Sequence, residues 1–346
     1  MIRVMIAEDS ASARVLLQHV LEDDGRFEVA GAAENGKAAV EMAERLRPDV
    51  ILMDVYMPHV DGLEATRQIM EKVPTPIVMT SASFTSDETA LTFAALEAGA
   101  LTIVEKPMRP SDPDFPRAAG HLALTLRMMS EVRVVRRWPR RAPAPPPAPP
   151  IALDRRIDAL AIGVSTGGPN VLAEILGSLP ADLGFPVFVV QHMALGFMDG
   201  FVRWLAKKTV LKVKVAEVNE WVRRGTIYIA PDDAHLLVEP GGRISLSGDA
   251  AEDGFRPSAS RLFRSVAASY GGSAMGVILT GMGHDGASGL LALRRAGGLT
   301  VAQDEASCVV FGMPGEAIRL GAAEQILPPP GIADLIRSLA RAGGRT

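Results

Sequence analysis

The sequence predicts two α/β domains joined by a proline-rich linker. Its 346 residues, 48% hydrophobic and 22% charged, have globular composition and exceed what one compact core of typical size holds. Short apolar runs alternate with amphipathic stretches on both sides of Arg136–Pro150. Proline removes backbone donors and favours extended chain, so we interpret that stretch as a semi-rigid spacer, with a docking segment for a partner protein as the alternative.

The region before the spacer predicts a doubly wound, five-stranded parallel sheet. Its apolar runs are bounded by helical patterns, as expected for buried strands with helical crossovers. The predicted strands are Val4–Ala7, Val29–Ala32, Val50–Met53, Ile77–Thr80 and Thr102–Val104.

The region after the spacer repeats this signal and predicts a second α/β domain with a mainly parallel sheet. The predicted strands are Ala159–Val164, Val187–Gln191, Val213–Ala216, Ile227–Ile229 and Met275–Thr280. The predicted helices are Val171–Leu179, Phe197–Lys207 and Ala287–Arg295.

Composition narrows the functional classes. A net charge of −4 offers no large basic field, which argues against a nucleic-acid partner. The single cysteine, Cys308, excludes an internal disulfide and fits a reducing compartment. The first residues carry acids where a signal peptide needs an apolar stretch, and no apolar run reaches membrane-spanning length. We therefore expect a cytoplasmic protein without membrane insertion, and a monomer because nothing demands an oligomer.

Acidic residues and a lysine follow the predicted strands of the first domain. Glu8, Asp9, Asp54 and Lys106 each come directly after an apolar run. The carboxyl ends of parallel strands meet at one edge of the sheet, so these side chains share one crevice. Carboxylate oxygens suit Mg²⁺, and a carboxylate beside such an ion is a nucleophile for phosphoryl transfer. Each acid taken alone is better explained as a helix cap.

The combination closely resembles the response-regulator receiver family over residues 1–125. The segment Asp54–Leu63 carries the resemblance, with Glu8-Asp9 before it and Lys106-Pro107 after it. The resemblance implies phosphorylation by a histidine kinase and assigns these roles: Asp54 accepts the phosphoryl group, Glu8, Asp9 and Asp54 hold Mg²⁺, Ser81 is the switch hydroxyl, and Lys106 contacts the phosphoryl group. Ile103 replaces an aromatic residue common in the family, which puts the signalling route in doubt.

A candidate nucleophile lies at a glycine-rich turn of the second domain. Ser165, within Gly163–Pro169, follows a predicted strand and precedes a helical pattern. Glycines permit the sharp turn that exposes such a hydroxyl, beside helix-start N–H groups that stabilise an oxyanion. A glycine-rich phosphate-binding turn would look similar and remains open.

Two further residues complete a candidate triad. His192 ends the strand Val187–Gln191, at the same sheet edge as Ser165, although a lone histidine there is often structural. Asp285 follows another predicted strand, where it would orient His192 or cap the next helix. His284 is a rival base, and His235 is explained as a packed or solvated side chain.

Seven segments of the second domain resemble the chemotaxis protein-glutamate methylesterase family over about residues 155–340. They are Gly163–Pro169, Gln191–Met193, Tyr228–Pro231, Arg256–Ser258, Thr280–Gly286, Gln303–Glu305 and Phe311–Pro314. The resemblance implies hydrolysis of glutamyl methyl esters, and deamidation of glutamines, on methyl-accepting chemoreceptors. Ser165 would be the nucleophile, His192 the general base and acid, Asp285 the orienting acid, and the backbone N–H of Met282 an oxyanion donor. Ester hydrolysis would need no cofactor.

The loop after His192 departs from the family. Ala194-Leu195 stands where two prolines are common, which predicts a more mobile loop.

We therefore expect a receiver domain at residues 1–125, an exit helix and linker at 126–154, and a methylesterase domain at 155–346. In the expected regulation, the unphosphorylated receiver covers the catalytic face until Asp54 is phosphorylated. The alternative is a phosphorylation-dependent docking protein with weak catalysis. A phosphatase or nucleotide-binding enzyme is disfavoured, because no P-loop lysine accompanies Gly163–Gly168.

Overall fold

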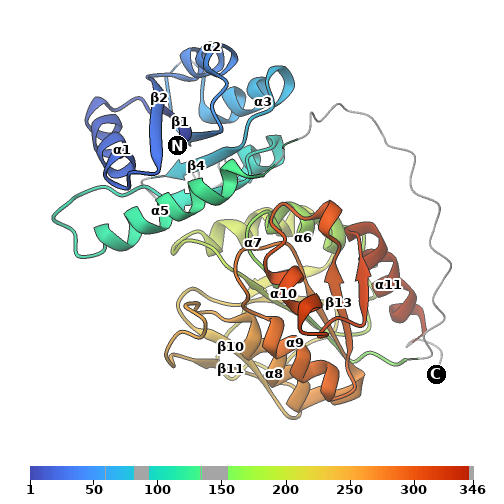
Figure 1. The fold of residues 1–346 in the computed structure, drawn as a ribbon. Helices are drawn as coiled ribbons and strands as arrows, with labels where there is room; N and C mark the ends of the chain where they lie inside the picture. The colour runs from blue at the N-terminus through green and yellow to red at the C-terminus, as the bar shows by residue number, and fades with distance from the viewer. Residues whose placement is uncertain (59, 82–92, 133, 135–154, 343–346) are drawn as a thin grey trace. The chain divides into compact units, whose positions relative to one another are not determined.

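The computed structural model describes residues 1–58, 60–81, 93–132, 134 and 155–342. The chain divides into two compact units, Met1–Ala142 and Pro143–Thr346 (Figure 1). The predicted spacer Arg136–Pro150 lies outside the described residues. Among the described residues, no helix combines the length and apolar character needed to cross a bilayer.

The first unit is the predicted doubly wound sheet. Its strands are β1 (Ile2–Ala7), β2 (Phe27–Ala33), β3 (Val50–Asp54), β4 (Ile77–Ser81) and β5 (Thr102–Glu105). They pair in parallel in the order β2-β1-β3-β4-β5. The described helices with assigned bounds are α1 (Ala11–Asp23), α2 (Gly36–Leu46), α3 (Gly62–Lys72) and α5 (Phe115–Ser130), and residues 93–98 are also helical.

Three of these helices begin where the sequence supplies a capping side chain. Ser10, Asn35 and Asp61 accept the N–H of the residue three places later at the starts of α1, α2 and α3. The chain passes from β1 to β2 on one side and reaches β3 on the other, so the strand order reverses between β1 and β3. Residues that follow these two strands therefore face one crevice.

The second unit is an α/β domain built on a seven-stranded parallel sheet. The order is β14-β13-β12-β6-β7-β9-β8. Its strands are β6 (Ala159–Val164), β7 (Val187–Gln191), β8 (Lys212–Val215), β9 (Thr226–Ile229), β12 (Ala274–Ile278), β13 (Leu299–Gln303) and β14 (Gln325–Leu327). An antiparallel hairpin, β10 (His235–Glu239) and β11 (Arg243–Ser247), stands apart from this sheet.

Helices cover both faces of the larger sheet. Packing joins α8, α9 and α10 into one layer and α11, α6 and α7 into another (Figure 1). Their bounds are α6 (Gly168–Gly177), α7 (Met198–Ala206), α8 (Ala259–Tyr270), α9 (Ala287–Arg295), α10 (Met313–Arg319) and α11 (Pro329–Ala342). The chain leaves β6 toward β7 and leaves β12 toward β13, so the strand order reverses between β6 and β12. Both sheets thus place a switch point beside predicted site residues.

Candidate active site

The acidic site of the first unit brings its predicted residues together at the switch point. Lys106 Nζ lies 2.6 Å from Glu8 Oε2 and 2.9 Å from Asp54 Oδ2. Ligand oxygens of Glu8, Asp9 and Asp54 all lie within 4.8 Å of one another. Ser81 is the buried last residue of β4, and its carbonyl accepts the backbone N–H of Lys106 at 3.1 Å.

The charges of this site are unbalanced. Burial raises the pKa of Asp54 to about 6, and the Glu8 and Asp9 carboxylates add to this, although Lys106 opposes them. Burial works against the charge of Lys106, but the Asp54 and Glu8 carboxylates outweigh it and raise the pKa of the lysine. Three acids thus face one lysine. A donor set of carboxylate oxygens with excess negative charge fits a divalent cation such as Mg²⁺.

The turn that carries Ser165 has the strand-to-helix form predicted from its glycines. Ser165 directly follows β6, its N–H donates to Thr280 O at 3.0 Å, and its carbonyl accepts the N–H of Gly168 at 3.0 Å. The left-handed conformation falls on Gly167 (φ 77°), which caps α6. Ser165 is not among the described non-glycine residues with positive φ, so glycine takes the strained position and the serine does not. The Ser165 hydroxyl makes no hydrogen bond within the described chain.

His192 and Asp285 form a buried hydrogen-bonded pair. His192 Nε2 lies 2.9 Å from Asp285 Oδ2. Since a carboxylate only accepts, the neutral imidazole in this geometry carries its proton on Nε2 and keeps its lone pair on Nδ1. Nδ1 is buried and has no hydrogen-bond partner among the described residues. The pair therefore presents an unprotonated imidazole nitrogen, as a general base requires.

Asp285 is fixed by the start of α8 as well as by His192. Its oxygens accept N–H groups of Ala259 (2.7 Å) and Ser260 (3.0 Å) and the Ser258 hydroxyl (2.8 Å). Burial alone would raise the pKa of Asp285, but the His192 bond and charge and the helix-start N–H groups outweigh it and lower the pKa to about 2. Asp285 therefore accepts N–H groups at the start of α8. It is not the N-cap of α9, the helix that follows it in the chain, because Gly286 occupies that position.

A side-chain amide ties the nucleophile turn to the histidine. Gln191 Nε2 donates to the carbonyls of Ser165 and His192, each at 2.8 Å. The N–H of His192 also donates to Val164 O at 3.0 Å, so the ends of β6 and β7 are joined beside Ser165.

The turn after β12 approaches Ser165 closely. A Cβ on Gly281 would lie 2.7 Å from Ser165 Cβ, so only glycine permits this approach. Met282 follows directly, and its backbone N–H makes no hydrogen bond within the described chain. An unpaired N–H beside the nucleophile turn is the feature that an oxyanion donor needs.

The other two histidines of the second domain contact residues other than Asp285. His284 is 64% exposed and lies 3.5 Å from Asp253. His235 is fully buried, where its Nδ1 accepts the N–H of Ser258 at 3.1 Å. Neither is paired with Asp285. In the loop after His192, the N–H of Gly196 donates to Asp232 at 2.9 Å, and the greater mobility of this loop stays a prediction.

Sequence reasoning gave no role to several supporting residues. Gln191 and Ser258 lie within segments that resemble the methylesterase family, and this was the only sequence feature that could have pointed to them. Phe255, whose ring stacks on His192, lies outside those segments and had no signal. The bonds from the 258–260 segment to Asp285 join residues about 26 positions apart, so spacing could not reveal them.

Comparison with known proteins agrees with the family resemblance of each domain. Residues 160–336 match the CheB methylesterase family, and residues 4–112 match the response regulator receiver domain. The "protein-glutamate methylesterase/protein-glutamine glutaminase 4" of Geobacter metallireducens is 48% identical over 98% of this chain and 99% of its own length. The protein of the same name from Myxococcus xanthus is 47% identical over 99% of this chain and 98% of its own length. The Thermotoga maritima CheB methylesterase catalytic domain, a crystal structure, is 37% identical with a TM-score of 0.51 over 53% of this chain and 98% of its own.

Proposed function

The chain belongs to the CheB methylesterase family, and from this premise we propose that Ser165, His192 and Asp285 hydrolyse glutamyl methyl esters on methyl-accepting chemoreceptors. The observation that carries the proposal is the buried His192–Asp285 pair. Asp285 Oδ2 lies 2.9 Å from Nε2 of His192, and Nδ1 has no partner within the described chain. The family-like Ser165 turn ends the neighbouring strand and is tied to His192 through Gln191.

The reaction proceeds through an acyl-enzyme. Ser165 Oγ attacks the ester carbonyl carbon while Nδ1 of His192 takes the hydroxyl proton, and Asp285 stabilises the resulting imidazolium. The backbone N–H of Met282 stabilises the oxyanion. The imidazolium then protonates the methoxide, which leaves as methanol. Water, deprotonated by His192, attacks the glutamyl ester of Ser165, and the imidazolium returns the proton to Ser165 Oγ as the glutamate side chain is released.

Deamidation of glutamine follows the same path. The carboxamide carbon takes the place of the ester carbon, and His192 protonates the leaving nitrogen so that ammonia departs. The relatives' names include this second activity.

Phosphorylation of the receiver regulates this hydrolase. A histidine kinase supplies the phosphoryl group to Asp54. Glu8, Asp9 and Asp54 would hold a Mg²⁺ ion, which would supply positive charge beside the transferring phosphoryl group. Lys106 contacts the phosphoryl oxygens, and Ser81, beside the Lys106 backbone, is the switch hydroxyl. The cluster of Glu8, Asp9 and Asp54 oxygens within 4.8 Å of one another supports this proposal, as does the pKa of Asp54, which burial and then the Glu8 and Asp9 carboxylates raise to about 6.

The proposed division of the chain is a receiver at residues 1–125, an exit helix and linker at 126–154, and a methylesterase domain at 155–346. Helix α5 crosses the first of these boundaries and ends at Ser130, so the receiver's last helix extends into the second segment. We also propose a cytoplasmic location, which the free Cys308 supports because unpaired thiols persist in reducing compartments.

The test is methanol release from methylated receptor membranes. The intact chain is compared with Ser165→Ala, each with and without a small phosphodonor and Mg²⁺. We expect release that rises with the donor and falls at least about 10⁴-fold in Ser165→Ala. No release from folded protein phosphorylated on Asp54 would contradict the proposal and favour a docking protein.

A further inference from the structure

The ring of Phe255 lies flat against the imidazole of His192. The ring centroids are 4.0 Å apart and the planes differ by 7°. Phe255 is half-buried, and no step of the reaction described above uses it. A ring in this place closes one face of the imidazole and leaves its edge, with both nitrogens, available for hydrogen bonds.

Phe255 is held by a tight turn. The backbones of Glu252 and Phe255 pair in both directions, with N–H to carbonyl distances of 3.1 Å and 2.9 Å. Asp253 and Gly254 between them both have positive φ, 53° and 83°, which closes the chain on itself. The position of Phe255 therefore depends on where Glu252 is anchored.

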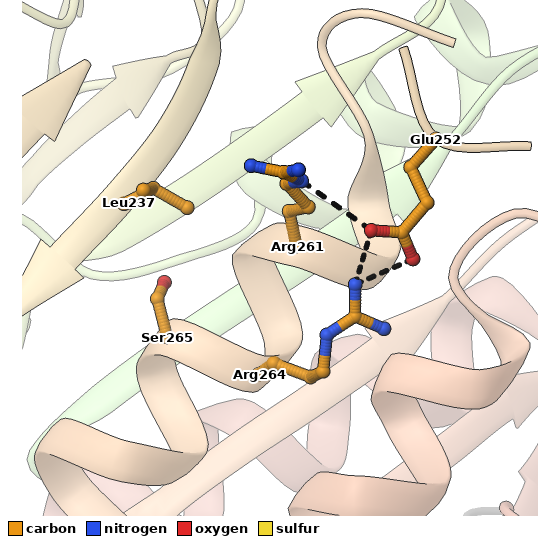
Figure 2. A pocket seen from close by; sticks show the side chains of 5 residues that line it. All are labelled: Leu237, Glu252, Arg261, Arg264 and Ser265. Carbon is orange, nitrogen blue, oxygen red and sulfur yellow. Dashed lines mark hydrogen bonds and ion pairs between the residues drawn. The ribbon is translucent and has the colours of Figure 1, made fainter. Parts of the chain in front are cut away.

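Two arginines of α8 anchor Glu252. Arg261 Nε lies 3.3 Å from its carboxylate, and a nitrogen of Arg264 contacts both carboxylate oxygens. Figure 2 shows Glu252 reaching over the helix to these two side chains, beside an open pocket. Arg261 also contacts Asp249 at 2.7 Å. Both arginines are thus already paired with acids, and their structural effect is to hold the turn against α8.

The same helix fixes the other partner of His192. The first turn of α8 supplies the N–H groups of Ala259 and Ser260 that bind Asp285. Helix α8 therefore controls the imidazole from two directions, through Asp285 at its edge and through Phe255 on its face. A histidine held by one hydrogen bond keeps torsional freedom, because its χ2 torsion is broad.

We propose that Phe255 is a positioning residue, which fixes the plane of His192 so that Nδ1 keeps its orientation during proton transfer with Ser165. The Glu252–Arg261–Arg264 ion-pair cluster holds Phe255 in place. This inference rests on the proposed roles of Ser165 and His192. It predicts a defect in the chemical step, because small displacements of a catalytic group slow the reaction more than they weaken binding.

The test compares Phe255→Leu with Phe255→Tyr in the full chain, using methanol release from methylated receptor membranes. Leucine keeps apolar bulk and loses the planar face, whereas tyrosine keeps the face. We expect Phe255→Leu to lower kcat about tenfold with KM changed less than about twofold. Phe255→Tyr should keep kcat near that of the unsubstituted chain. Glu252→Gln, which weakens the anchor, lowers kcat by a smaller factor. Asp253→Asn is the matched control on the same turn and keeps wild-type kcat.

A second readout does not depend on activity. The proton shared by His192 and Asp285 is followed in the low-field proton NMR spectrum. We expect its exchange with water to accelerate in Phe255→Leu and to stay slow in Phe255→Tyr. Wild-type kcat and slow exchange in Phe255→Leu, or a raised KM with unchanged kcat, would overturn the inference. Absence of methanol release from the unsubstituted chain would instead overturn the proposed function.

Discussion

Asp54 and Asp285 are both buried carboxylates at the switch point of a parallel sheet, yet their surroundings act in opposite directions. Asp54 shares its crevice with two further acids and one lysine, and burial with this crowding raises its pKa to about 6. Asp285 is hydrogen-bonded to His192, accepts N–H groups on both oxygens and the Ser258 hydroxyl on one, and its pKa falls to about 2.

The opposite pKa shifts of Asp54 and Asp285 fit the different role proposed for each site. Surplus negative charge at Asp54 is relieved when a cation binds, so that site responds to ligands. The charge of Asp285 is stabilised by His192 and by the N–H groups at the start of α8, so its orientation is set before substrate arrives. These surroundings suit the roles proposed for the two sites, a phosphorylation switch in the first unit and a preorganised catalytic pair in the second.

The largest effect is expected from reversing the donor pattern at Asp285. In Asp285→Asn, the new amide N–H donates to Nε2 of His192 and moves the imidazole proton to Nδ1, which then cannot accept the Ser165 proton. We expect kcat for methanol release to fall by about 10³- to 10⁴-fold. Phosphorylation of Asp54 by a small phosphodonor is measured in parallel and should be unchanged. A loss of less than tenfold would show that Asp285 does not set the tautomer.

Removal of Mg²⁺ separates the two sites. With a chelator, phosphorylation of Asp54 from a small phosphodonor should fall by at least about tenfold, because surplus charge repels the incoming group. Basal ester hydrolysis by the same sample should be unaffected, since the proposed triad needs no ion. Glu8→Gln should weaken Mg²⁺ binding, and equal phosphorylation with and without Mg²⁺ would refute the assigned ligand set.

A smaller effect sharpens the role of α8. Ser258→Ala removes one donor to Asp285 and the N-cap of α8, because the Ser258 hydroxyl serves both. We expect the free energy of unfolding of the second unit to fall by about 1–2 kcal/mol, with a several-fold loss of kcat. Ser178→Ala is the matched control, since that hydroxyl donates to a helix carbonyl away from Asp285. Equal losses of kcat in the two variants would contradict a specific role for Ser258.

The sequence predicted the strand ends better than their surroundings. Continuous apolar runs end beside Asp54, Ser165 and His192, so the two sheets and the edge carrying each site follow from pattern alone. Strand β13 (Leu299–Gln303) and helix α8 were not singled out, although β13 is fully buried. Local pattern also failed to show that His284 turns toward Asp253, or that the N–H groups of Ala259 and Ser260 meet Asp285, because these contacts arise from packing of distant segments.

The contrast between Asp54 and Asp285 is tested most directly by the free energy of unfolding of the variants Asp54→Asn and Asp285→Asn, measured at pH 7 without Mg²⁺. The raised pKa of Asp54 stabilises the fold below its ordinary value of 3.8, and this contribution is lost as pH rises through about 6. The lowered pKa of Asp285 stabilises the fold above 3.8 and is lost as pH falls through about 2.

We therefore expect Asp54→Asn to raise the free energy of unfolding of the first unit by about 1–2 kcal/mol. Asp285→Asn should lower that of the second unit by about 3 kcal/mol. Saturating Mg²⁺ should cancel the gain in Asp54→Asn, because the cation compensates the charge that asparagine lacks. Two changes of the same sign at pH 7 would contradict the account.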